Sequence, residues 1–265
     1  MNPCPLIPPI SKRFGFSTNR TGGHMARSMM QSELAILARA LPRETTRPEY
    51  RTAILAGNLL GKPTFSSREN SFRHLVELYG LDPQLALFRV LRELTAADPA
   101  SLPLVTMTCA FCRDAQLRHS FALIETLKPG EALARERMEE HLETGFPGRF
   151  SPAMTQTLAQ HVNTTWTVAG HLTGRSHKRR AVPTARMVAS VYALFAGYLL
   201  GLRGEILLQS VFARLVAPDA FLVAHHLAAA SARGWLRFRQ GGGVVEIDCS
   251  PLLTTEEREW LHDAD

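Results

Sequence analysis

The chain has 265 residues, of which 45% are hydrophobic and 20% are charged, which is typical of a soluble globular protein with room for two domains. Its 30 Lys and Arg residues outnumber its 24 Asp and Glu residues, and the formal net charge of +6 favours a polyanionic partner. The 4 cysteines are too few and too scattered for a disulfide framework, so we expect a reduced, cytoplasmic protein.

Membrane insertion is not expected. The apolar start at residues 5–10 contains prolines and precedes the first basic residues, unlike a secretory signal. The most apolar uncharged run, residues 187–202, is shorter than the roughly 20 residues that cross a bilayer, so we expect a buried helix there.

Residues 1–27 are expected to be a poorly ordered extension. Early prolines are followed by a stretch rich in Ser, Thr, Asn, Gly and Arg, a composition that buries little apolar surface. Helical patterning begins after Ser28 or Ser32, and no strand pattern precedes Trp235. We therefore predict a mostly α protein in which residues 28–172 form a helical bundle.

Capping residues mark the starts of the bundle helices. Thr46 with Glu49 and Ser66 with Glu69 have the spacing of capping boxes, which satisfy free backbone N–H groups at a helix start. A longer helical stretch is expected to bend near Arg113. Further starts are predicted at the pairs Asp82-Pro83, Asp98-Pro99 and Ser151-Pro152.

Residues 184–250 have the order of a winged helix, and residues 251–265 are expected to add a C-terminal helix. Residues 235–239 alternate like a strand, the glycines at 241–243 form a turn, and residues 244–247 return as a second strand. Short helices followed by a two-stranded ribbon make the winged-helix order. The helices are predicted at 184–202, 205–216 and 220–232.

Residues 173–183, between the bundle and the winged helix, are predicted to be a basic linker. Each cation that neutralises a phosphate releases counterions, so this run could contact nucleic acid; the alternative is a solvated loop. Its candidate phosphate contacts are Arg175, His177, Lys178, Arg179 and Arg180.

The winged helix supplies a second set of candidates, Arg233, Arg237 and Arg239. Arg237 and Arg239 alternate with Leu236 and Phe238, so both arginines are expected on the outer face of the strand. That face could contact phosphate or be the solvent side of a hairpin. Together with the basic linker, these residues are expected to form one cationic surface.

The third helix of this module is poorly suited to reading bases. A recognition helix needs Arg, Lys, Asn or Gln near its N-terminal end. After Asp219, however, its polar side chains are His225, His226, Ser231 and Arg233. Contact with DNA is therefore expected through phosphates and the wing, and a packing or protein-interface role for this helix is the alternative.

No motif points to catalysis. Cys109 and Cys112 form a single CxxC without the second pair that zinc requires, and inside a helical pattern they are expected to be core thiols and not a redox site. The histidines lack ligand spacing, and there is no Walker motif or nucleophile elbow. We predict no metal, no cofactor and no small-molecule substrate, and therefore no enzyme.

Two segments resemble a known family. Residues 50–68, with an Asn-x-Leu-x-Lys run and a Ser/Thr-rich cap, and residues 102–121, with an Arg-Asp pair, resemble the BrxA proteins of BREX phage-defence systems. The resemblance implies a small, non-enzymatic, DNA-binding component of a phage-defence island, with a NusB-type helical N-terminal domain and other defence proteins as partners. It also makes Lys62, Arg68 and Arg73 candidate phosphate contacts, because they cluster at the start of a helix.

The first functional expectation is therefore an accessory protein that binds duplex DNA mainly through phosphates, with little sequence preference. Three alternatives stay open. The chain could be a protein-interaction adaptor of a multi-subunit complex that docks through the third helix, or an RNA-binding helical module. The third alternative is a redox enzyme that uses Cys109 and Cys112.

Overall fold

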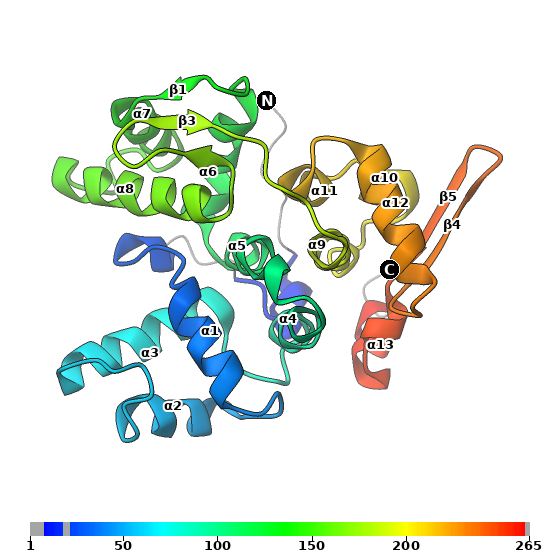
Figure 1. The fold of residues 1–265 in the computed structure, drawn as a ribbon, viewed down its shortest axis with the longest axis horizontal. Coiled ribbons are helices and arrows are strands. Elements are labelled where there is room, and N and C mark those ends of the chain that lie inside the picture. The colour runs from blue at the N-terminus through cyan, green and yellow to red at the C-terminus, as the bar shows by residue number, and fades with distance from the viewer. Residues whose placement is uncertain (1–7, 18–21, 263–265) are drawn as a thin grey trace.

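Helices make up most of the computed structural model, which describes residues 8–17 and 22–262 (Figure 1). The expected mostly α fold class is confirmed. The N-terminal part contains the short 3-10 helices η1 (Pro9–Phe14) and η2 (Gly23–Met25), followed by α1 (Gln31–Ala40), α2 (Arg47–Leu55), α3 (Phe65–Tyr79), α4 (Ala86–Ala97), η3 (Pro99–Ser101), α5 (Leu102–Arg113), α6 (Ala115–Thr126), α7 (Arg135–Gly145) and α8 (Pro152–Val168).

The C-terminal part places helices before a hairpin, in the expected order. The expected second helix is divided in two, because Ser210 accepts a hydrogen bond from the Ala213 N–H group (3.4 Å) and so caps a new helix. The elements are α9 (Met187–Tyr198), α10 (Gly204–Leu208), α11 (Val211–Val216), α12 (Ala220–Ser231), β4 (Arg237–Gly241), β5 (Val244–Asp248), η4 (Ser250–Leu252) and α13 (Thr255–His262).

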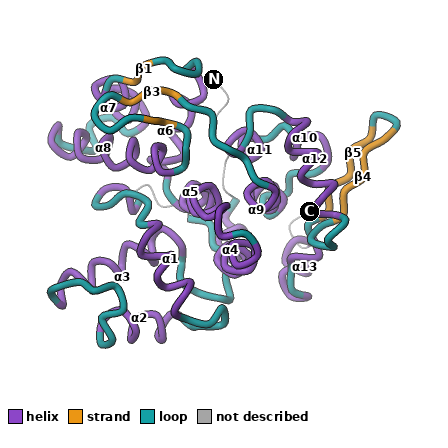
Figure 2. Tube along the Cα trace, viewed as in Figure 1, coloured by secondary structure: helices purple, strands orange, loops and turns teal. Residues whose placement is uncertain are grey.

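Helices α5 and α9 lie at the centre of the molecule (Figure 2), and most of their side chains are buried. The expectation of a buried apolar helix at α9 is confirmed. This helix packs against α4 and α5 of the N-terminal part and also against α11 and α12. One cluster of buried side chains therefore continues through both parts of the chain.

No single helix within residues 8–17 and 22–262 is long and apolar enough to cross a membrane. In those ranges, only the bent pair Gly204–Val216 and Ala220–Ser231 has the length and the apolar composition of a membrane span when its two members are taken together.

The N-terminal extension is more ordered than its composition indicates. Phe14 and Phe16 are buried in the core, and His24 is fully buried. The expectation of disorder is therefore wrong for residues 8–17 and 22–27. A few apolar anchors at the right spacing decide whether a segment packs, and average composition does not register them. The other residues of the extension lie outside the described ranges.

Several predicted helix starts are confirmed. The Thr46–Glu49 capping box forms, with the Thr46 N–H group donating to Glu49 Oε2 at 2.7 Å. The bend expected near Arg113 is a break between α5 and α6, where the Asp114 carboxylate accepts hydrogen bonds from the first turn of α6. Ser151 likewise caps α8.

Two predicted starts are wrong. The capping box of α3 is formed by Thr64 and Ser67, and not by Ser66 and Glu69. The Asp82-Pro83 pair forms a separate turn ahead of α4, in which the aspartate accepts a backbone hydrogen bond. Ser, Thr and Asp cap turns as readily as they cap helices, so their spacing alone does not give the register.

A small sheet occupies the region expected to be a linker. Strands β1 (Ala132–Leu133), β2 (Leu172–Thr173) and β3 (Lys178–Arg180) pair antiparallel in the order β1-β3-β2. The expectation of no strand before Trp235 is wrong, because strands this short carry no alternating pattern. The predicted linker at residues 173–183 is therefore held in the fold, because its strand β3 is hydrogen-bonded to β1 on one edge and to β2 on the other.

Candidate nucleic-acid interface

The predicted phosphate-binding residues lie in three separate places. Figure 1 shows β3 of the small sheet and the β4–β5 hairpin on opposite sides of the molecule, with α9 and α11 between them, while α3 lies apart from both. The basic run and the β4–β5 hairpin are therefore apart in the fold, which does not support the single cationic surface expected from them.

Strand β3 turns its basic side chains to both faces of the small sheet. Lys178 and Arg180 stand in register with buried leucines of β1 and β2, whereas Arg179 stands in register with exposed neighbours. Because side chains alternate across a strand, Arg179 points outward and the other two lean toward the core.

Arg180 is the least available of these cations. Its Nη1 donates to the backbone oxygens of His171 and Ala181. Its Nε is buried with no partner among the described residues, and burial lowers the pKa of the guanidinium. The side chain therefore fastens β3 to the end of α8, which does not support its predicted phosphate contact.

Most of the other basic side chains of the run are open to solvent. Arg175, His177 and Arg179 are exposed, and Lys178 is half-buried. Lys178 Nζ donates to Gly174 O (2.8 Å), and Arg179 Nη1 donates to a backbone carbonyl of the neighbouring turn (3.0 Å). Within residues 8–17 and 22–262, none of the four side chains forms an ion pair with a carboxylate.

Sequence reasoning missed Lys128, which tertiary structure brings beside β3. The Gly130 N–H group donates to Arg180 O, and the Arg180 N–H group donates to Glu131 O, both at 2.8 Å. The turn that contains the exposed Lys128 is thereby fixed against the strand, a pairing that no local signal reveals. We call the following residues the β3 patch: Lys128, Arg175, His177, Lys178 and Arg179.

Two acidic residues near the patch are already engaged by other groups. Glu131 accepts the Lys128 N–H group (2.9 Å) and pairs with Arg137 (2.9 Å), and these contacts lower the pKa of its carboxyl group. Glu125 pairs with Arg214 at 2.5 Å. Each carboxylate therefore has its own arginine, and neither forms an ion pair with a side chain of the β3 patch among the described residues.

The arginines of the β4–β5 hairpin, the predicted wing, are exposed but paired. Arg237 and Arg239 are 71% and 83% exposed on the face where the alternation predicts them. The strand register sets Asp248 opposite Arg237 and Glu246 opposite Arg239, at 3.0 Å and 3.8 Å between charged atoms. Exposed ion pairs add little stability, but they reduce the net charge that the wing presents to a polyanion.

Helix α12 presents an apolar outer face. Phe221 is 84% exposed and Leu222 is 39% exposed, and the exposed His225 follows one turn later. Arg233, beyond the helix end, lies 5.6 Å from the Trp235 ring centroid in a cation–π contact. The expectation that this helix lacks base-reading side chains agrees with these positions.

The third group, near the start of α3, serves the fold. Lys62 Nζ pairs with Glu33 at 2.9 Å. Arg68 donates to backbone carbonyls of α2 and of the following loop, and Arg73 donates to Asn70 at 3.0 Å. Lys62 and Arg68 therefore fasten the loop between α2 and α3, which does not support the phosphate contacts implied by the family resemblance.

A buried polar relay was also missed by sequence reasoning. His24 Nδ1 lies 2.9 Å from Asp114 Oδ2, and His24 Nε2 lies 2.8 Å from Thr165 Oγ1. Burial raises the pKa of Asp114, but contact with His24 outweighs burial and brings this pKa below its usual value. The carboxylate therefore stays ionised.

The order of this relay, carboxylate, imidazole and hydroxyl, occurs in hydrolases. Here, however, the exposed fractions of His24, Asp114 and Thr165 are 0%, 1% and 0%. Thr165 Oγ1 also accepts the Met29 N–H group at 3.1 Å. The relay therefore anchors the N-terminal segment to α5, α6 and α8, and no substrate reaches its hydroxyl in this conformation.

The CxxC pair lies inside α5. Cys109 and Cys112 are buried, and burial raises the pKa of the Cys109 thiol to about 11 and that of Cys112 well above its ordinary value. A protonated and inaccessible thiol is a poor nucleophile and a poor metal ligand. These positions support the interpretation of both residues as core thiols.

No protein-family model matches this chain, and no curated protein matches it either.

Proposed function

We propose that the protein binds double-stranded DNA through the phosphate backbone, with little sequence preference and without catalysing a reaction. The observation that carries the proposal is the β3 patch, whose cations have no ion-pair partners in the part of the chain that the structure describes. Every phosphate that such a group neutralises releases condensed counterions, which favours binding irrespective of base sequence.

The C-terminal elements support a second, weaker contact. Residues 217–219 separate α11 from α12 as in a helix-turn-helix, and the β4–β5 hairpin packs beside α12. We infer that these elements are a winged helix. Because the outer face of α12 lacks base-reading side chains, the contribution of this module comes from its wing.

The resemblance of residues 50–68 and 102–121 to the BrxA proteins supports a more specific setting. We infer a cytoplasmic accessory component of a BREX-type phage-defence system, with NusB-type N-terminal helices and other defence proteins as partners. A fold hosts many functions, so this setting needs its own test. That test is co-purification of the chain with the products of neighbouring genes.

The DNA proposal is tested by three double charge reversals of equal charge change. They are Arg175→Glu with Arg179→Glu in the β3 patch, Arg237→Glu with Arg239→Glu in the wing, and Arg51→Glu with Arg73→Glu on α2 and α3. Binding to a 20-base-pair duplex of random sequence is measured over a range of salt concentrations. The first pair should flatten the slope of log K against log salt by about 2, since each lost phosphate contact removes about 0.9.

The outcomes separate the possible interfaces. The wing pair should weaken binding less than the β3 pair, and the pair on α2 and α3 should have only the small effect of a changed net charge. Equal losses from all three pairs would mean that the overall charge and not the β3 patch drives binding. A single-stranded RNA or duplex RNA that outcompetes the DNA would replace the DNA proposal by the RNA alternative.

A protein-interaction adaptor is the second candidate function, and one observation favours it. Phe221 and Leu222 are neighbours at the start of α12 and are 84% and 39% exposed, and contiguous exposed apolar surface can mark a protein-interaction site. If α12 docks on a partner, Phe221→Ser should abolish that association and leave DNA binding unchanged. The reverse result would assign Phe221 to the DNA interface instead.

A further inference from the structure

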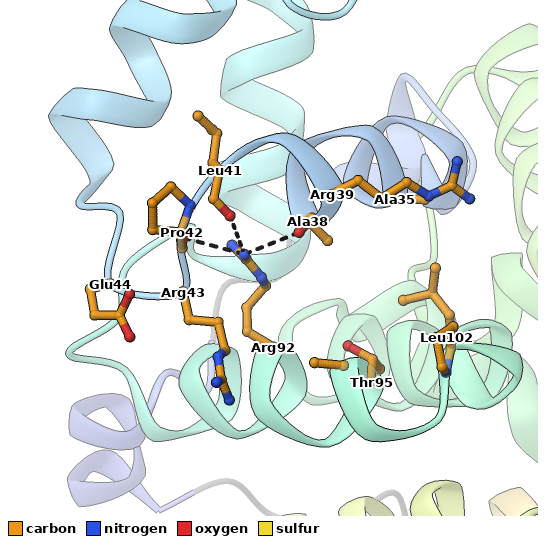
Figure 3. A pocket seen from close by; sticks show the side chains of 12 residues that line it. Ala35, Ala38, Arg39, Leu41, Pro42, Arg43, Glu44, Arg92, Thr95 and Leu102 are labelled. Atoms are coloured by element: carbon orange, nitrogen blue, oxygen red, sulfur yellow. Dashed lines mark hydrogen bonds between the residues drawn. The ribbon is translucent and has the colours of Figure 1, made fainter.

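A cavity of about 530 Å³ opens between α1 and α4, away from the β3 patch. Figure 3 shows it bounded above by α1 and the loop that follows, and below by α4. Its volume falls within the roughly 300–1,000 Å³ of typical small-molecule sites. The cavity therefore has the size of a ligand site, and its lining decides which ligand class fits.

Small side chains create the space. Ala35 and Ala38 face it from α1, and Ala96 faces it from α4. Larger side chains at these positions would close the gap between the two helices, as they do elsewhere in the core. Pro99 and Leu102 complete an apolar wall at the end toward α5. This wall suits a compact apolar group.

The opposite end is cationic. Arg92 is 3% exposed, and its Nη2 donates to the backbone oxygens of Leu41 (2.8 Å), Pro42 (3.3 Å) and Ala38 (3.4 Å). Its Nη1 donates to the hydroxyl of Tyr50. All of these partners are neutral, so a guanidinium is buried here without a carboxylate among the described residues, an arrangement that attracts an anion.

Two further arginines add positive charge to the lining, Arg43 on the side of Arg92 and Arg39 on the side of Leu102. Arg39 and Arg43 line the cavity, are exposed, and form no ion pair in residues 8–17 or 22–262. Glu44 is the one carboxylate among the lining residues. With Arg92, the lining therefore carries an excess of positive charge next to an apolar wall.

We propose that this cavity binds a small organic anion, in which a carboxylate or phosphate group is joined to a compact apolar body. The anionic group contacts Arg43 and Arg92, and the apolar body lies against Ala96 and Leu102. Carboxylates and phosphates share the geometry that a guanidinium recognises. The inference does not depend on DNA binding, because none of its residues belongs to the β3 patch or the wing.

The test compares charged and neutral probes on the full chain by isothermal titration calorimetry. Hexanoate is paired with hexanamide, and phenyl phosphate with phenol, so that each pair keeps the apolar body and changes the charge. At least one of the anions should bind with a Kd of about 1 mM or tighter, and its neutral counterpart about tenfold more weakly. The tighter anion identifies the preferred head group.

Variants locate the site. Ala96→Leu should fill the cavity and weaken binding of the anion at least about tenfold, whereas Ala97→Leu, the exposed neighbour outside the lining, should leave it unchanged. Arg43→Gln should weaken the anion and spare the neutral probe. The proposal is overturned if neither anion binds at 10 mM, if neutral probes bind as tightly as anions, or if Ala96→Leu binds like the unmodified chain.

Discussion

The small sheet and the wing both place arginines on a solvent-facing strand, yet the two regions differ in what stands across the strand. In the wing, the cross-strand neighbours of Arg237 and Arg239 are Asp248 and Glu246. In the small sheet, the neighbours of Arg179 are Ala132 and Thr173. The same alternating pattern therefore yields paired charges in one place and unpaired charges in the other. The availability of a cation depends on its neighbour as much as on its exposure.

The largest expected effect comes from giving the small sheet the pairing of the wing. Ala132→Glu with Thr173→Glu sets carboxylates opposite Arg179 on both sides, and should lower DNA affinity roughly tenfold or more at low salt by ion pairing and by repulsion of phosphate. Fluorescence anisotropy with a labelled duplex measures the change. Thr157→Glu with Gln156→Glu, on the exposed side of α8, adds the same charge elsewhere and should cost much less. Similar losses in both variants would contradict the comparison.

Acidification should destabilise the small-sheet region at a higher pH than the wing. Burial lowers the pKa of His171 to about 3, and its backbone oxygen accepts from Arg180 of β3. Below about pH 6.5 the His171 imidazole binds a proton in the unfolded chain but not in the folded chain. The free energy of unfolding therefore falls by about 1.4 kcal/mol per pH unit between about pH 6.5 and pH 3.

The wing responds to a different group. Burial raises the pKa of Asp248, but hydrogen bonds from Ser250 and Tyr198 outweigh burial and lower this pKa overall. The ionised carboxylate therefore stabilises the folded state above about pH 4, and this stabilisation is lost as the pH falls further. Amide hydrogen exchange at pH 7 and pH 5, corrected for intrinsic rates, should show lost protection around β3 with the wing unchanged. Equal loss in both regions, or none around β3, would exclude this linkage.

Asp248 should contribute more to the stability of the folded state than Arg237, its exposed ion-pair partner. Its carboxylate accepts hydrogen bonds from Tyr198 Oη (3.0 Å), the Ser250 N–H group (2.8 Å) and Ser250 Oγ (2.9 Å), besides pairing with Arg237. Asp248→Asn should therefore cost about 1–3 kcal/mol in urea unfolding, because partly buried donors lose an ionised acceptor. Arg237→Gln, which removes only the exposed partner, should cost less than about 1 kcal/mol. A larger cost for Arg237→Gln would reverse this ranking.

The smallest expected effect comes from freeing a wing arginine. Glu246→Gln removes the carboxylate 3.8 Å from Arg239, and should raise DNA affinity about twofold because the cation becomes available to phosphate. Glu259→Gln on α13 makes the same change of net charge at an exposed position outside the wing. Equal gains from both substitutions would show that the wing does not approach the DNA.

Local signals predicted much of the helical framework. The Thr46–Glu49 box, the Ser151 cap and the apolar run of α9 each depend on neighbours within one or two helical turns, and each was found where expected. The N-terminal extension and the small sheet were not predicted. Their structure depends on insertion of Phe14 and His24 into a distant core and on strands too short to show a period.

The candidate site was predicted only as a list of charges. Arg175 and Arg179 were found from the density of basic residues, but nothing near Lys128 in the chain indicates its place beside β3. Conversely, Lys62 and Arg68 were proposed as contacts, and their bonds to Glu33 and to backbone carbonyls became visible only in the folded chain. The cavity between α1 and α4 left no sequence signal at all.

The amino-acid sequence by itself determined which segments become most of the helices, where several of them begin, and that the protein carries excess positive charge, because these properties depend on residues close together in the chain or on composition alone. Tertiary structure alone decided which cations are free. Pairs such as Arg214 with Glu125 and Arg186 with Asp98 join residues far apart in the sequence, and the charges left over define the surfaces that can bind an anion. Coulomb attraction acts over a few ångströms of space, and only the fold sets those distances.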